Sequence, residues 1–110
     1  MKRKLCHTFS SSVLLTTGAV ILEIGNALGK EFRAEAVSVI KVLSHSARVE
    51  VTVVDSKLIG KGLAVYEKYA DKTWGLVDCL SFVVMRESGL TEVLTFDRNF
   101  EQAGFTVLAS

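Results

Sequence analysis

The sequence predicts an α/β protein in which a parallel sheet carries helices on both faces, a three-layer α/β/α architecture. Two observations support this fold class. Short apolar runs typical of strands alternate along the chain with longer stretches whose apolar residues recur at helical spacing. The elements follow the order strand, helix, helix, strand, helix, helix, strand, turn, strand, and this alternation is characteristic of parallel sheets covered by helices.

The composition indicates one globular domain that spans residues 1–110. Apolar residues make up 49% of the chain and charged residues 23%, which suits a single core. A net charge of +1 gives no overall attraction to nucleic acid, so any such binding must rest on local patches. The basic start Met1–Lys4 is not followed by a long apolar run, and Cys6 and Cys79 lie far apart. We therefore expect a cytoplasmic protein with free thiols and no membrane span or signal peptide.

The first half of the chain begins with an atypical segment, residues 1–12. Leu5–Phe9 alternates like a short strand, and three serines follow it. Val13–Leu15 is a continuous apolar run, as found in strands buried on both faces. Thr17 is then a suitable N-cap for a helix over Gly18–Leu28, which ends near a glycine.

One acid lies beside the apolar stripe of this first helix. Val20, Ile24 and Leu28 recur on one face, and Glu23 sits at the edge of that stripe rather than opposite it. The other elements are assigned by the same periodicities and by their caps. They are a helix over Arg33–His45, a strand over Arg48–Val54, a helix from Asp55 or Ser56 to Tyr69 with the inward stripe Leu58, Ile59, Gly62, Leu63 and Tyr66, a helix over Asp78–Glu87 ended by Gly89, a strand over Glu92–Phe96, a turn or single helical turn over Asn99–Ala103, and a strand over Gly104–Leu108.

Three acids from separate segments are predicted at the same edge of the sheet. Asp97 follows the strand over Glu92–Phe96, Asp78 opens a helix, and Glu23 lies in the second turn after a strand. Three neighbouring carboxylates repel one another unless a hard divalent cation such as Mg²⁺ or Mn²⁺ neutralises them. Each acid also has an ordinary interpretation, because Asp78 can cap its helix, Asp97 can form a turn and Glu23 can pair with a surface lysine.

Three blocks of the sequence resemble motifs of PIN-domain proteins. Val20–Leu28 resembles the helix motif that carries an active-site Glu, and Trp74–Phe82 resembles the segment that carries an Asp. Leu94–Phe100 resembles the segment with the last Asp, and Gln102–Phe105 continues the match. The resemblance covers roughly Val13–Leu108 and is closest to VapC-like members of the family.

The resemblance implies a PIN-like fold and a Mg²⁺- or Mn²⁺-dependent endoribonuclease, commonly the toxin of a toxin–antitoxin pair. Its partners would be RNA and an antitoxin. By this carry-over Glu23, Asp78 and Asp97 are catalytic metal ligands, and the metal would activate water for attack on a phosphodiester. Basic residues nearby are candidates for holding the RNA backbone, namely Lys30, Arg33 and Arg98.

The chain departs from the family pattern at its start. Family members open with a strand that ends in a further active-site Asp and is followed by about two helices, and nothing in Met1–Ser12 supplies that acid. Leu5–Phe9 is too close to Val13–Leu15 to be its parallel neighbour, since a parallel crossover takes a dozen residues or more. We therefore expect an N-terminally shortened PIN-like domain with a gap in the middle of the sheet.

Three arrangements would close this gap. Leu5–Phe9 could fold back as an antiparallel strand, a second copy could supply a strand in an intertwined homodimer, or a truncated chain could close its sheet differently. We favour the homodimer. The functional alternative to a working ribonuclease is a catalytically impaired PIN remnant that acts as a binding or dimerising protein, and the third alternative is a purely structural α/β protein.

Overall fold

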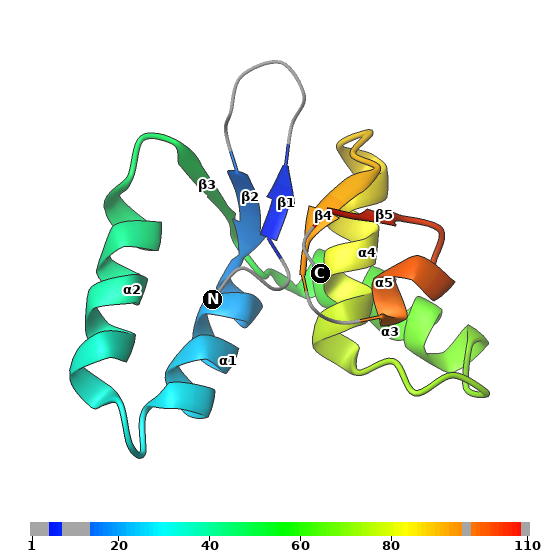
Figure 1. Cartoon of the computed structure of the whole chain (residues 1–110). Helices are drawn as coiled ribbons and strands as arrows, with labels where there is room; N and C mark the ends of the chain where they lie inside the picture. Colours follow the sequence, from blue (N-terminus) through cyan, green and yellow to red (C-terminus); the bar gives the residue numbers. More distant parts are fainter. Residues whose placement is uncertain (1–4, 8–13, 96–97, 109–110) are drawn as a thin grey trace.

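The computed structural model describes residues 5–7, 14–95 and 98–108 (Figure 1). In this part of the chain none of the helices is long and apolar enough to cross a lipid bilayer. The elements in chain order are β1 (Leu5–His7), β2 (Leu14–Thr17), α1 (Gly18–Leu28), α2 (Arg33–His45), β3 (Val49–Thr52), α3 (Ser56–Lys68), α4 (Leu76–Glu87), β4 (Glu92–Leu94), α5 (Asn99–Gln102) and β5 (Thr106–Val107).

The sheet has the strand order β3-β2-β1-β4-β5. β2 runs parallel to β3, and β4 runs parallel to β5, whereas β1 is antiparallel to both of its neighbours. Because β2 and β4 both run antiparallel to β1, the four strands other than β1 share one direction, and their carboxyl ends lie at one edge of the sheet. We call this edge the rim. The parallel sheet predicted from the sequence is therefore confirmed for every strand except β1.

β1 occupies the position between β2 and β4 where the sequence predicted a gap. Its backbone pairs Cys6 with Leu15 on one side and with Val93 on the other. The antiparallel fold-back, one of the three arrangements expected from the sequence, is therefore what fills the gap in this chain, and the homodimer stays a prediction. An antiparallel neighbour needs only a short connection, which the few residues before β2 can provide.

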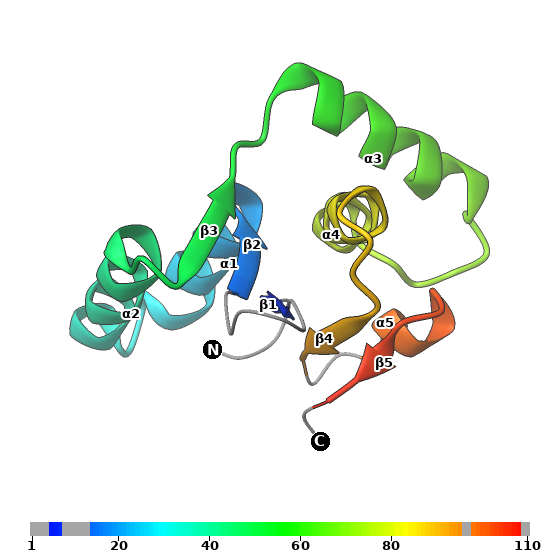
Figure 2. The ribbon, with the colours of Figure 1, turned by 90° about the horizontal axis from the view of Figure 1, so that it is seen from above.

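The helices form a layer on each face of the sheet. The adjacent residues Leu14 and Leu15 of β2 contact different clusters, as neighbours on a strand do. Leu14 packs with α1 and α2 around Val20, Ile24 and Leu43. Leu15 belongs to the larger cluster, to which α4 contributes more residues than any other element, and Figure 2 shows α4 lying between α3 and the sheet. The predicted three-layer fold is confirmed.

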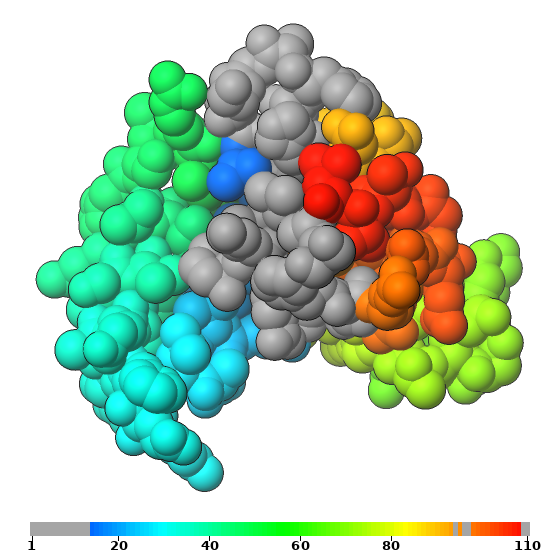
Figure 3. All heavy atoms as spheres, viewed as in Figure 1, coloured from blue at the N-terminus to red at the C-terminus, as the bar shows by residue number. Residues whose placement is uncertain are grey.

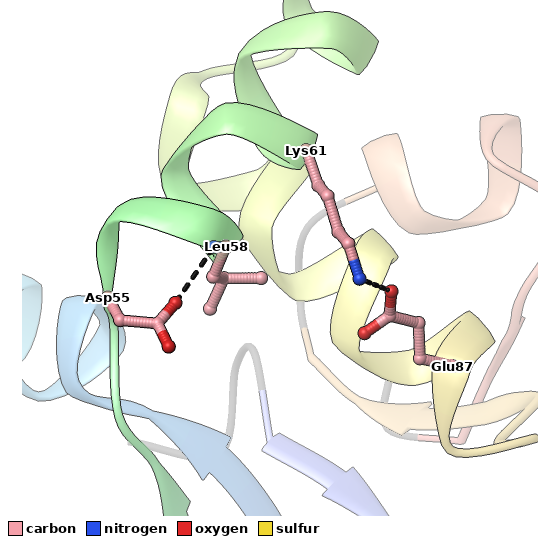
Figure 4. Close-up of polar contacts among 4 residues, drawn as sticks. All are labelled: Asp55, Leu58, Lys61 and Glu87. Carbon is pink, nitrogen blue, oxygen red and sulfur yellow. Dashed lines mark hydrogen bonds and ion pairs between the residues drawn. The ribbon is translucent and has the colours of Figure 1, made fainter.

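The outer surfaces of the two layers differ in shape. The hairpin of α1 and α2 extends beyond the sheet on one side of the molecule (Figures 1 and 3). On the other side α3 lies against α4, and its first turn is capped by Asp55, whose Oδ1 accepts a hydrogen bond of 2.8 Å from the Leu58 backbone N–H (Figure 4). An exposed ion pair between Lys61 and Glu87 joins α3 to the end of α4.

The orientation of α3 differs from the one that the sequence predicts. Leu58 and Gly62 are buried against α4, whereas Ile59, Leu63 and Tyr66 of the predicted inward stripe are exposed. The apolar stripe is wider than the contact between the two helices. Because Gly62 has no side chain, α3 approaches α4 closely there. The side of α3 that carries Gly62 therefore packs on α4, and the adjacent apolar residues point outward.

Alanine at the two glycines of α3 is expected to change stability in opposite directions. A Cβ on Gly62 would lie 2.5 Å from Leu80 Cδ2, so we expect Gly62→Ala to lower the free energy of unfolding by about 1–3 kcal/mol. A Cβ on Gly60 would meet nothing within 4 Å, so Gly60→Ala should raise it by about 0.5–1 kcal/mol through helix propensity. Urea denaturation measures both, and equal changes would contradict the close packing.

Candidate active site

Glu23 is placed near the rim by the direct junction of β2 and α1. Thr17 ends β2 and caps α1, since its side chain accepts a hydrogen bond of 3.3 Å from the Val20 backbone N–H. The cap satisfies a backbone donor that the first turn leaves without a helical partner, so the strand passes into the helix without a loop. Glu23 follows in the second turn of α1 and is half-buried. The sequence prediction for its place in the helix is confirmed.

Asp78 lies in the first turn of α4 and is only 5% exposed. Its Oδ2 accepts a hydrogen bond of 3.1 Å from the Gly75 backbone N–H, so the capping interpretation is correct for this oxygen. The helix begins at Leu76, two residues before the predicted start. A capping carboxylate does not need burial, as the exposed cap Asp55 shows. This burial distinguishes Asp78 from an ordinary cap, because a carboxylate is costly to remove from water.

The first turns of α1 and α4 each contribute a residue to the hydrophobic cluster of the other helix. Ala19 of α1 contacts the cluster that α4 dominates, and Val77 of α4 contacts the cluster of α1 and α2. Glu23 lies one turn after Ala19 on the same side of α1, and Asp78 is next to Val77. Glu23 and Asp78 thus lie on two helices whose first turns pack together, and the convergence of the three acids stays a prediction.

Asp97, the third predicted acid, lies outside the described residues, as does Phe96. The chain on both sides of them is described: Thr95 is fully buried, and α5 begins at Asn99. Trp74 Nε1 donates a hydrogen bond of 3.0 Å to Gln102 Oε1, which joins the segment before α4 to α5. Figure 3 shows these two segments side by side. The segments that flank Asp78 and Asp97 are therefore held together.

The described acids alone do not form a metal site. Within residues 5–7, 14–95 and 98–108, no group of three or more His, Cys, Asp or Glu side chains could hold a metal ion. The predicted set includes Asp97 and therefore extends beyond these residues. Its carboxylate oxygens are the donors that Mg²⁺ and Mn²⁺ prefer, so the chemistry of the set fits such an ion.

The basic residues suggested for RNA binding have local contacts. Arg33 Nε donates a hydrogen bond of 2.8 Å to the Gly29 carbonyl at the end of α1. Arg98 forms an exposed ion pair of 2.6 Å with Glu101. Lys30 is exposed and lies beyond the end of α1, about two helical turns from Glu23. These local contacts do not test RNA binding, which stays a prediction for all three residues.

Cys79 is a core residue, as the sequence predicts. Its side chain is fully buried in the cluster around α4. Burial raises the pKa of the Cys79 thiol, and the negative charge of the neighbouring Asp78 raises it further. A thiol in this environment stays protonated near neutral pH, so it is not a nucleophile.

Comparisons with known proteins agree with the architecture. No curated protein matches the chain. The crystal structure of Mycobacterium tuberculosis VapC20, a Sarcin-Ricin loop cleaving toxin, superposes with a TM-score of 0.82 at 25% sequence identity. The match covers 92% of this chain and 78% of that one. Residues 3–106 match the PIN domain family. The sheet order, the two helix layers and this nearly complete match have one explanation: the chain belongs to the PIN domain family and has a VapC-like fold.

Proposed function

We propose that this chain is a metal-dependent endoribonuclease and the toxin component of a toxin–antitoxin system. The observation that carries the proposal is the buried Asp78 at the rim of a PIN fold, beside the helix that carries Glu23. VapC20, which has a similar fold, is a toxin that cleaves the Sarcin-Ricin loop, so an RNA loop is the proposed class of substrate.

In this proposal the chain's own residues orient the reacting groups. Glu23, Asp78 and Asp97 would hold Mg²⁺ or Mn²⁺ through carboxylate oxygens. When bound, the ion lowers the pKa of a coordinated water and stabilises negative charge that develops on the phosphate. The Gly75 backbone N–H fixes Oδ2 of Asp78, and the buried surroundings restrict the rotation of that carboxylate. Glu23 is held by the rigid junction of β2 and α1.

A second function is favoured by one observation, the direction of β1. Because β1 is antiparallel to β2 and β4, its carboxyl end lies at the edge of the sheet opposite the rim. The described residues of β1 therefore place no acid at the rim, where the family resemblance implies that the first strand ends in one. The alternative is a catalytically impaired PIN remnant that binds an antitoxin or dimerises. Leu22, Val37 and Val42 on α1 and α2 are exposed and offer apolar surface to such partners.

Titration with Mn²⁺ by calorimetry separates the two functions. The wild-type chain should bind Mn²⁺, and Glu23→Gln should weaken binding at least about 10-fold, because the amide removes one anionic ligand. Glu35→Gln changes an exposed acid in the first turn of α2 and should bind as the wild type does. RNA cleavage should stop when EDTA removes the ion. No Mn²⁺ binding by the wild type would contradict the enzyme and favour the remnant.

A further inference from the structure

A groove of about 750 Å³ lies between the C-terminal half of α3 and the segment that leads into α4. Leu63 and Tyr66 form one wall, and both are exposed although they are apolar or aromatic. Lys72 and Trp74 lie on the other side. This volume is within the range of sites that bind small molecules or single groups of a larger ligand.

The groove adjoins the segment that holds Asp78. Gly75 lines the groove, and its backbone N–H holds Asp78 Oδ2. Trp74 also lines the groove, and its indole N–H binds Gln102 of α5, in the segment that follows Asp97. A nucleotide in the groove would therefore lie next to the residues that contact Asp78 and α5.

The lining chemistry suits one unpaired nucleotide. Tyr66 is 47% exposed, and its ring is of the kind on which a base can stack. Lys72 offers an ammonium for a phosphate, and its exposed contact of 3.5 Å with Asp71 is of a kind that contributes little free energy. Glu67 lines the groove on the α3 side and repels phosphate, so it favours a backbone path along Lys72.

We propose that this groove binds an unpaired RNA nucleotide next to the cleaved phosphodiester, with its base on Tyr66 and Leu63 and its phosphate at Lys72. This inference rests on the proposed function and adds a specificity site to it. A base inside a duplex cannot present its face to Tyr66, so the groove selects single-stranded or loop RNA. The competing occupant is a second copy of the chain, because Leu63 and Tyr66 are also suitable protein contacts.

The test measures RNA binding without cleavage, in EDTA, with a single-stranded RNA of about 12 nucleotides. Trp74 is the only tryptophan of the chain and lines the groove, so its emission should change when RNA binds. Tyr66→Ala should weaken binding about 5- to 100-fold, as the loss of one base stack does, and Tyr66→Phe should bind as the wild type does. Ile59→Ala is the matched control, because Ile59 is 44% exposed on the same helix outside the groove.

Three outcomes decide the inference. RNA binding by Tyr66→Ala at wild-type affinity overturns it, whether or not the chain cleaves RNA. A fall in molar mass in light scattering for Tyr66→Ala, with RNA affinity unchanged, overturns it in favour of a second copy. RNA binding that is weaker for Tyr66→Ala but unchanged for Tyr66→Phe and Ile59→Ala supports the inference. If this pattern is found and the wild type cleaves no RNA with Mn²⁺ present, only the proposed catalytic function fails.

Discussion

The Asp78→Asn variant is expected to lose RNA cleavage while keeping its fold. The amide has the same shape as the carboxylate, and its oxygen can still accept the hydrogen bond from the Gly75 backbone N–H. The variant therefore retains the cap of α4 and loses the negative charge proposed to bind the metal. We expect cleavage to slow at least about 100-fold, because a ligand matters more than the outer contacts that orient it. Initial rates on a labelled RNA with Mn²⁺ measure the loss, and thermal melting measures the fold.

A matched control exists at the start of α3. Asp55 caps that helix through a hydrogen bond of 2.8 Å to the Leu58 backbone N–H, but it is exposed and belongs to no acid cluster that we predict (Figure 4). Because Asn and Asp are similar helix caps, Asp55→Asn should leave both the melting temperature and the cleavage rate nearly unchanged. Cleavage by Asp78→Asn at the wild-type rate would contradict the assigned site. Equal loss in both variants would indicate an effect of net charge on RNA binding.

The helices could be predicted closely because their ends are encoded locally. The predicted bounds of α1 and α2 agree with the structure, and Thr17 acts as the predicted cap of α1. Gly89 adopts a φ of 71°, the left-handed conformation expected of a glycine after a helix end. For α4 the sequence predicts Asp78 as the first residue, whereas Gly75 is the N-cap and Asp78 lies three positions later. The helix is confirmed, and only the predicted position of Asp78 in its first turn is wrong.

The arrangement of β1 could not be predicted in the same way. Strand direction depends on partners that are distant in sequence, here Leu15 and Val93 on either side of Cys6, and no local residue encodes that choice. The outward orientation of Tyr66 was missed for a related reason. The apolar stripe of α3 is wide enough for two orientations, and the close approach at Gly62 decides between them. The apolar periodicity of α3 therefore does not predict the groove beside Tyr66.

The aromatic cluster behind the site predicts the largest change in stability. Phe82 is completely buried, and its ring centroid lies 5.1 Å from that of Trp74, 4.8 Å from that of Phe100 and 5.7 Å from that of Phe105. Phe82→Ala removes all these contacts and leaves a cavity, so we expect the free energy of unfolding to fall by about 3–5 kcal/mol. Domains of this size have about 5–15 kcal/mol in total. Urea denaturation followed by circular dichroism measures the change.

Phe32→Ala is the matched control, because Phe32 is 51% exposed and its truncation should cost less than about 1 kcal/mol. The cluster also connects stability to the site. Trp74 packs on Phe82 and binds Gln102, so a cavity at position 82 loosens the contact that holds the segments beside Asp78 and Asp97 together. We therefore expect Phe82→Ala to cleave RNA more slowly than its folded fraction alone explains. Cleavage in proportion to the folded fraction would show that the cluster stabilises the fold without positioning the acids.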